Sequence, residues 1–75
     1  MATVFEGVTY DDRHGGPFDR GSADSYYRRE MSPHYYAGAT AQSERIGYEQ
    51  MTNDQLAEYV AGYNYNEEFG DKKDY

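Results

Sequence analysis

The chain has no cysteine and few aliphatic residues, and both shortages limit how it can hold itself together. Its 75 residues include one leucine, one isoleucine and three valines. Without cysteine there is neither a disulfide nor a thiolate metal site, two devices that often stabilise very small domains. A single domain of this size buries little apolar surface, so we expect it to depend on a larger partner or on self-association.

Long apolar runs are missing as well. No stretch approaches the ~20 apolar residues of a membrane span, and the first residues lack the apolar core of a signal peptide. We therefore expect a soluble protein without a membrane partner, located in the cytoplasm of a bacterial host cell.

Positive charge is scarce, because seven basic residues stand against fourteen acids and the net charge is −7. Residues 46–75 carry seven acids against two lysines, whereas residues 20–45 carry four arginines against three acids. Ordinary nucleic-acid binding needs clustered lysine and arginine and is disfavoured. Two interpretations stay open: a solvated acidic surface, or acids that present a phosphate-like field to a basic partner.

Tyrosine is the abundant large residue, with ten copies beside three phenylalanines. A tyrosine ring is apolar and carries a polar tip, so it suits both small cores and contact surfaces. We expect some of the rings to form a small core and the others to face a partner.

Several local signals predict a helix over residues 53–64. Thr52 and Gln55 have the spacing of a capping box, and Met51 and Leu56 have that of a hydrophobic staple. Helical spacing continues in one apolar stripe: Leu56, Tyr59, Val60 and Tyr63.

A second helix is predicted over residues 20–31, with Asp19 or Ser22 as its cap. Gly21 disfavours a helix interior, and Pro33 ends the helix by restricting the residue before it. We expect the two helices to pack through one set of residues: Ala23, Tyr26, Leu56, Tyr59, Val60 and Tyr63.

The remaining segments predict little regular structure. Residues 1–18 form an extended arm or loop, in which Thr3–Tyr10 is strand-like only if it adds to a partner's sheet. Residues 67–75 form an acidic tail. The predicted fold class is therefore small all-α, a two-helix mini-domain over residues 19–66 whose helices are joined by an irregular loop.

One layout runs through two fragments, RGSADSYYRREMSPHY at Arg20–Tyr36 and EYVAGYNYNEE at Glu58–Glu68. It consists of a helix start with Arg-Gly and Ala, a Glu-Met-x-Pro-aromatic turn, and a later aromatic–small–Gly–aromatic helix. About half of the chain resembles the ribosome modulation factor family in this way. The matching positions are Arg20, Gly21, Ala23, Glu30, Met31, Pro33, Tyr35, Tyr59, Gly62 and Tyr63.

The resemblance implies two helices joined by a loop, and an activity that binds the ribosome and holds it inactive. Members of that family are strongly basic, as contact with ribosomal RNA requires, whereas this chain is acidic. Arg20, Arg28 and Arg29 would have to supply a local basic patch. The same layout also looks like small uncharacterised proteins of phages and bacteria, and that likeness implies no function.

No residue pattern indicates catalysis. His14 lies near Asp11 and Asp12, but the spacing matches no established metal-ligand motif. No serine, histidine and acid combination can be argued, and Gly15-Gly16 lacks the lysine that a phosphate-binding loop requires. We therefore expect a protein that is not an enzyme and needs no cofactor or metal.

Two groups of residues are the predicted contact sites. The acidic group is Asp54, Glu58, Glu67, Glu68 and Asp71. The aromatic and basic group is Tyr27, Arg28, Arg29, Tyr35 and Tyr36, since tyrosine and arginine dominate binding hot spots.

The preferred hypothesis is a phage-type inhibitor of a host nucleic-acid-handling protein, in which the acidic group occupies a basic groove as a nucleic-acid mimic. One alternative is a ribosome-associated, hibernation-like factor that works through its arginines. Another alternative is a small structural subunit of a larger assembly.

Overall fold

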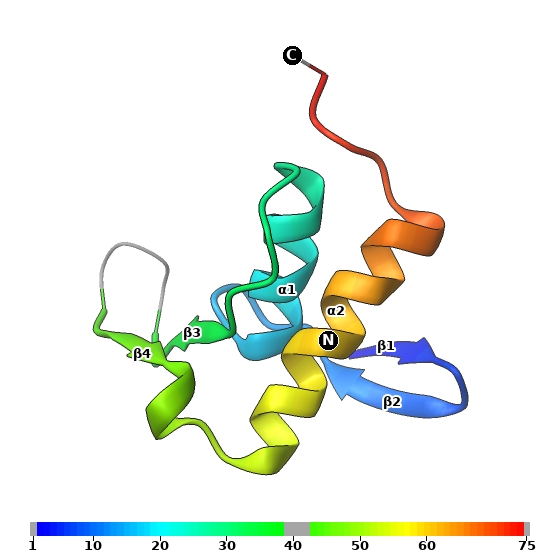
Figure 1. Ribbon diagram of the computed structural model, residues 1–75. Coiled ribbons are helices and arrows are strands. Elements are labelled where there is room, and N and C mark those ends of the chain that lie inside the picture. The colour runs from blue at the N-terminus through cyan, green and yellow to red at the C-terminus, as the bar shows by residue number, and fades with distance from the viewer. Residues whose placement is uncertain (1, 39–42, 75) are drawn as a thin grey trace.

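Two helices and two small antiparallel sheets make up the protein in the computed structural model, which describes residues 2–38 and 43–74 (Figure 1). In chain order, the elements are β1 (Ala2–Phe5), β2 (Val8–Asp11), α1 (Pro17–Tyr26), β3 (His34–Tyr36), β4 (Arg45–Gly47), a 3-10 turn η1 (Tyr48–Gln50) and α2 (Asn53–Phe69). The predicted all-α class is wrong, because each sheet is a hairpin formed by segments that were expected to be irregular.

The predicted N-terminal arm is a β-hairpin, because Thr3–Tyr10 contains both of its own strands. Phe5 pairs with Val8 across the turn, and the two turn residues Glu6 and Gly7 have φ angles of +51° and +78°. Positive φ at both central positions characterises the tight turn that fits the twist of a hairpin. The arm therefore needs no partner sheet to become a pair of strands.

Helix α1 begins and ends earlier than predicted. Its N-cap is Gly16 with Pro17 as the first helical residue, and Asp19 accepts a hydrogen bond from the Gly15 amide at 2.8 Å. The helix ends at Tyr26 instead of Met31, because Arg28 adopts a left-handed φ of +59° just beyond the C-cap.

The two helices cross so closely that only glycine fits at the crossing. A Cβ atom on Gly21 would lie 2.0 Å from the Tyr59 carbonyl oxygen, and one on Gly62 would lie 2.0 Å from the Phe18 carbonyl oxygen. The predicted contact set is therefore wrong in part: Tyr59 is fully buried, whereas Tyr26 and Val60 are 37% and 36% exposed.

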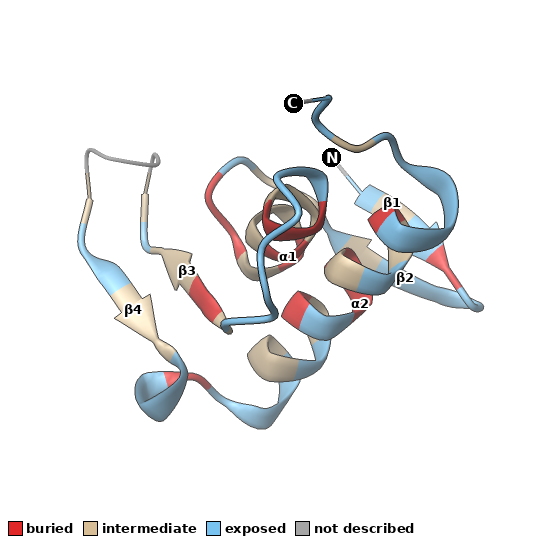
Figure 2. Cartoon of the chain, turned by 45° about the horizontal axis from the view of Figure 1, so that its top comes forward, coloured by how far each residue is buried: buried red, intermediate tan, exposed pale blue. Residues whose placement is uncertain are grey.

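The core is aromatic and lies between the helices and the first hairpin (Figure 2). Phe5 and Phe18 are buried with Ala61, and the half-buried rings of Tyr10 and Tyr65 pack against them. Tyr10 stacks on Phe18 with ring centroids 5.3 Å apart, and the Phe5 ring meets Tyr65 edge-on at 5.6 Å. Rings of this size replace the aliphatic interior that the sequence cannot supply.

Segments that join the helices are also ordered where the structure describes them. The predicted irregular loop contains the β3–β4 hairpin, in which Tyr35 pairs with Ile46. Residues 39–42, between these strands, lie outside the described part. Within the described residues, no helix is both long and apolar enough to cross a membrane.

Candidate functional site

A buried polar network joins α1, α2 and the segment before β3. Asp24, only 3% exposed, accepts a hydrogen bond from the Tyr59 hydroxyl, which in turn accepts one from the Ser32 amide at 3.0 Å. Burial first, and then the hydrogen bond to Asp24, raise the pKa of Tyr59 far above its ordinary value. The network holds the helices together and leaves no open space for a substrate around the hydroxyl.

His34 extends this network and has a defined proton position. Arg20 Nε can only donate, so the contact of 3.2 Å makes His34 Nε2 the acceptor. The other ring nitrogen, Nδ1, then donates to the Ser32 carbonyl at 2.8 Å. Both ring nitrogens are engaged in structural contacts, so His34 is positioned as a core residue and not as a base.

A second polar cluster ties the C-terminal segment to α1. Ser25 is fully buried, and its hydroxyl donates to the Glu67 carboxylate at 2.5 Å. The side-chain amide of Asn66 donates to the Ser25 hydroxyl at 3.0 Å. Lys72 donates to the Ser25 carbonyl at 3.1 Å and pairs with Glu67. The amide of Lys73 donates to the Tyr26 carbonyl at 2.7 Å, so the predicted tail caps the C-terminal end of α1.

An acidic edge, defined as Asp11, Asp54 and Glu58, forms where the end of β2 meets the N-terminal half of α2. Burial first, and then the charges of Asp11 and Asp54, raise the pKa of Glu58, which Arg13 lowers in part. Residues 11 and 58 are far apart in sequence, so the fold itself brings these like charges together. A cationic partner group would relieve their repulsion.

The five acids predicted as a contact group do not share one surface. Asp54 and Glu58 stand one turn apart on α2, and exposed Glu68, about four turns after Asp54, returns to the same side. Glu67 points to α1 and is paired with Lys72, and the carbonyl of Asp71 accepts from the Asn66 side chain at 3.1 Å. Only part of the group therefore stands with the acidic edge.

An apolar groove lies beside the acidic edge, between the β1–β2 hairpin and α2. It consists of two adjoining hollows of about 390 and 420 Å³, which share Tyr10 and Ala57. Its apolar lining is Phe5, Val8, Tyr10, Leu56, Ala57, Val60 and Ala61. Glu6 lines the first hollow, and Asp54 and Glu58 line the second, so carboxylates flank an apolar floor.

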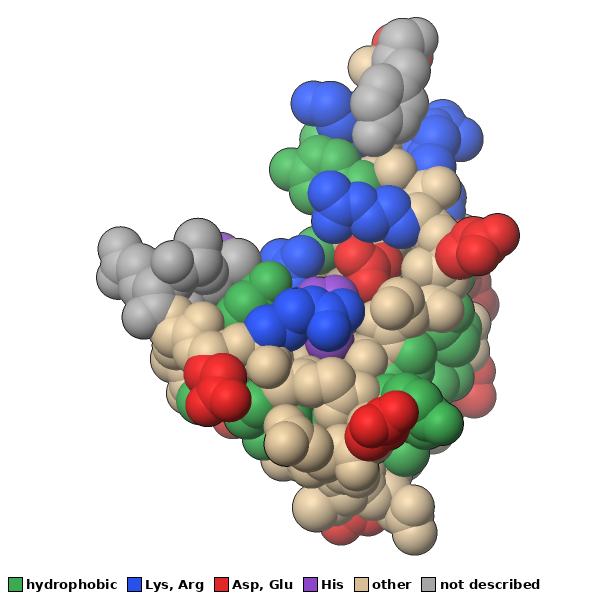
Figure 3. Space-filling model, turned by 60° about the vertical axis from the view of Figure 1, so that its left-hand side comes forward, with side chains coloured by type: hydrophobic (Ala, Val, Ile, Leu, Met, Phe, Trp, Pro, Cys, Tyr) green, Lys and Arg blue, Asp and Glu red, His purple; other side chains and the backbone are tan. Residues whose placement is uncertain are grey.

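Basic side chains gather on a different face, where Figure 3 shows them as a band of Lys and Arg. We define the basic cluster as Arg28, Arg29, Lys72 and Lys73, which lie at the C-terminal end of α1. Arg29 and Lys73 lie over the Tyr27 ring at 4.9 and 5.8 Å from its centroid, and Arg28 Nε donates to the Lys73 carbonyl at 3.0 Å. Three predicted residues, Tyr27, Arg28 and Arg29, are thus brought together with two lysines that were not predicted.

Tyr35 and Tyr36 are separated from this cluster because they belong to β3. The Tyr35 hydroxyl accepts from Gln55 at 3.2 Å, and the Tyr36 carbonyl accepts from Arg13 at 2.9 Å. Arg20 lies 5.6 Å from the centroid of the Tyr36 ring. Both tyrosines are half-buried and serve to attach the second hairpin to the helices.

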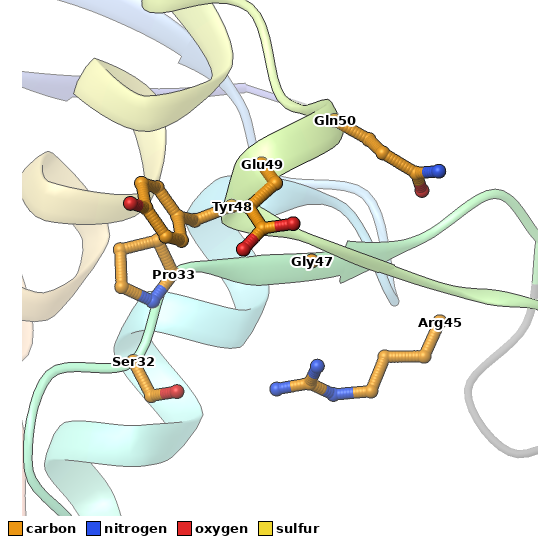
Figure 4. Close-up of a pocket in the computed structure, with 7 residues that line it drawn as sticks. All are labelled: Ser32, Pro33, Arg45, Gly47, Tyr48, Glu49 and Gln50. Atoms are coloured by element: carbon orange, nitrogen blue, oxygen red, sulfur yellow. The ribbon is translucent and has the colours of Figure 1, made fainter.

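A third hollow of about 330 Å³ opens beside β4 and η1 (Figure 4). Arg45 and Glu49 project toward it, and the Tyr48 ring lies next to Pro33. The opposite charges of Arg45 and Glu49 give this hollow no preference for one sign of ligand. Among the described residues, no group of three His, Cys, Asp or Glu side chains could hold a metal ion.

Comparisons with family models, curated proteins and solved structures found no match for this chain. The resemblance to the ribosome modulation factor family therefore stays a prediction.

Among the residues of these surfaces that were not predicted as contact residues are Glu6, Val8, Asp11 and Lys73. The first three were assigned to an arm, so nothing placed them beside α2. A signal was present, because Glu6-Gly7 separates two short β-type segments, as a hairpin turn does. Lys73 had no local signal, since tertiary contacts with Tyr26, Tyr27 and Arg28 bring it to the end of α1.

Proposed function

We propose that this protein is a binding protein that covers a basic surface of a larger macromolecule and modulates it by doing so. The observation that carries the proposal is the acidic edge, where Asp11, Asp54 and Glu58 converge from two elements. Nucleic-acid-handling proteins are the proposed class of partner, because their working surfaces are rich in lysine and arginine. Occupation of such a surface would exclude nucleic acid from it.

Electrostatics support this choice over a purely solvated surface. Burial, and after it the charges of Asp11 and Asp54, raise the pKa of Glu58, so the ionised carboxylate at this place is a cost to the folded chain. The charge of −7 also steers the molecule toward positive surfaces over distances of about a Debye length, ~8 Å in physiological salt. Exposed apolar groups beside the edge give the contact an affinity that charge alone does not provide.

The test is capture of a partner by tagged protein, compared with a variant that carries Asp54→Lys and Glu58→Lys. Exposed Glu44 and Glu49, changed to lysine together, provide a control with the same change in net charge at a different place. We expect the partner to be captured by the wild type and the control, lost with the first variant, and displaced by duplex DNA. Equal capture by both variants, or no effect of DNA, would refute the proposal.

A second candidate function is contact with nucleic-acid phosphates, as in a ribosome-associated factor, and the basic cluster favours it. Arg28 and Lys73 lie side by side at one end of the molecule, next to an aromatic ring. Two carboxylates, Asp24 and Glu67, neutralise Arg29 and Lys72, so the net field of the cluster is weak. Sedimentation with ribosomes, lost on Arg28→Gln with Lys73→Gln, would support this candidate; absence of the wild type from the ribosome fractions would exclude it.

A further inference from the structure

We propose that the apolar groove between the β1–β2 hairpin and α2 binds a basic amphipathic α-helix of the partner. This inference rests on the proposed function, because it names the element that the acidic edge and groove would receive. It goes beyond that function in assigning the centre of the contact to apolar side chains and the periphery to charge pairs.

The first argument is where the aliphatic side chains lie. All three valines are on the surface: Val4, Val8 and Val60 are 64%, 48% and 36% exposed. Val60 and Leu56, the only leucine, line the groove together, while the interior is built from aromatic rings. Val8, Leu56 and Val60 thus lie in one groove that no other part of the described chain covers, as a docking surface requires.

The second argument is the charge on both sides of this floor. Glu6 lines the groove on the hairpin side, where β2 ends at Asp11, whereas Asp54 and Glu58 line it on the helix side. The complementary surface is an apolar stripe with lysine or arginine on either side of it. That distribution describes a basic amphipathic helix, and it disfavours both a nucleic acid and an acidic peptide.

The third argument is the length of the groove. Its lining on α2 runs from Asp54 to Asn64, which corresponds to about 15 Å at the helical rise of ~1.5 Å per residue. This length accommodates about three turns of a second helix, with apolar anchors at positions i, i+3 or i+4, and i+7.

The backbone conformation of Glu6 agrees with a role for its carboxylate in binding at the groove. Glu6 holds a left-handed φ of +51° in a turn position where asparagine or glycine is preferred. The fold alone would be served better by asparagine. Glutamate instead places a carboxylate in the lining of the first hollow.

The probe is a synthetic 14-residue peptide of leucine and lysine, with its leucines in one helical stripe and a fluorescent label at its N-terminus. A second peptide has the same composition in an order that breaks the stripe, and a third has glutamate for every lysine. In fluorescence anisotropy with the whole protein, we expect the first peptide to bind at least tenfold more tightly than either of the others. Equal affinity for the first two peptides, as extended binding or charge alone would give, would overturn the helix assignment.

Substitutions then locate the contact. Ala57 is exposed at the junction of the two hollows, so Ala57→Phe should fill the groove and weaken peptide binding at least tenfold. Ala57→Ser is the matched control and should change binding less than twofold. Glu6→Asn should weaken binding about threefold while leaving the fold at least as stable, which separates a lost contact from a damaged fold.

The outcomes distinguish this inference from the proposed function. One outcome would refute the groove assignment and leave the proposed function standing. In that outcome, the Ala57→Phe variant binds the amphipathic peptide as tightly as the wild type does, while the variant with Asp54→Lys and Glu58→Lys no longer captures the partner. If the charge reversal leaves capture of the partner unchanged, the proposed function fails, and the groove assignment fails with it.

Discussion

The crossing of α1 and α2 makes a sharp prediction about two glycines. Glycine inside a helix costs about 1 kcal/mol relative to alanine, so Gly62→Ala would stabilise an isolated helix. In the folded chain, however, the new methyl group would lie 2.0 Å from the Phe18 carbonyl oxygen and 2.8 Å from its carbon. These are backbone atoms of the opposite helix, so the contact cannot be relieved by turning a side chain.

The two effects can be compared in size. Overpacking costs about 1–3 kcal/mol, and sometimes more where rigid backbone is the obstacle. Because the obstacle is backbone, we take the upper end of this range, about 3 kcal/mol; less the gain in helix propensity of about 1 kcal/mol, we expect a net loss of about 2 kcal/mol for Gly62→Ala, and the same for Gly21→Ala. For a domain of this size, that loss lowers the melting temperature by roughly 8–16 °C.

Urea and thermal unfolding followed by circular dichroism would measure both variants. Gly47→Ala is the control, because its Cβ would meet nothing closer than 3.8 Å, so it should leave stability unchanged or slightly raised. The double variant Gly21→Ala with Gly62→Ala should lose less than the sum of the single losses, since one separation of the helices relieves both contacts. If Gly62→Ala were as stable as the wild type, the helices could not approach as closely as described.

Three further changes test the polar contacts. Tyr59→Phe removes the hydroxyl between Asp24 and Ser32, so we expect a loss of about 1–3 kcal/mol in urea unfolding, and unchanged stability would contradict the network. Because the pKa of Tyr59 is raised above 10.0, the folded chain keeps the hydroxyl proton to higher pH than the unfolded chain does, so stability should fall as pH rises above 10.0. An absorbance titration at alkaline pH should show one tyrosine that ionises only when the chain unfolds. Glu58→Gln should raise the melting temperature at neutral pH. Because the pKa of Glu58 is raised in the folded chain, the wild type loses stability as pH rises from 4.5 through the folded pKa. If the variant showed the same pH dependence of stability as the wild type, ionisation of Glu58 would be excluded as the cause. Lys72→Met should speed hydrogen exchange of the Lys73 amide, since Lys72 holds this segment on Ser25, whereas unchanged exchange would show that the other contacts suffice.

The start of α2 could be predicted because its signals are local. The Gln55 amide donates to the Thr52 hydroxyl at 3.1 Å, and the Thr52 amide donates to the Gln55 side chain at 2.9 Å, so the predicted capping box is confirmed. The end of α2 was predicted too early, at residue 64 instead of Phe69. The last turn depends on contacts of Asn66 with α1 and with the following segment, which no local pattern reveals.

The hairpins and the helix contact were missed for a different reason. In the first hairpin, Glu6 occupies a turn position where asparagine or glycine is usual, so the residue type did not indicate a turn. At the crossing, Gly21 was interpreted as a cost to α1, whereas its missing side chain is what lets α2 approach. At the crossing, the residue that is locally unfavourable is explained by what it faces in the folded chain.

The same reasoning changes what the shortage of aliphatic residues means. In the sequence, this shortage predicted a chain that needs a partner to complete its core. In the structure, Phe5 and Phe18 fill the interior, and the fully buried Tyr59 adds hydrogen bonds to its packing, without help from the valines. Val8 and Val60 are therefore left on the surface, where their exposure lowers solubility without adding to the core. Retention of apolar groups at this place, between carboxylates, is understandable if they serve binding and not folding.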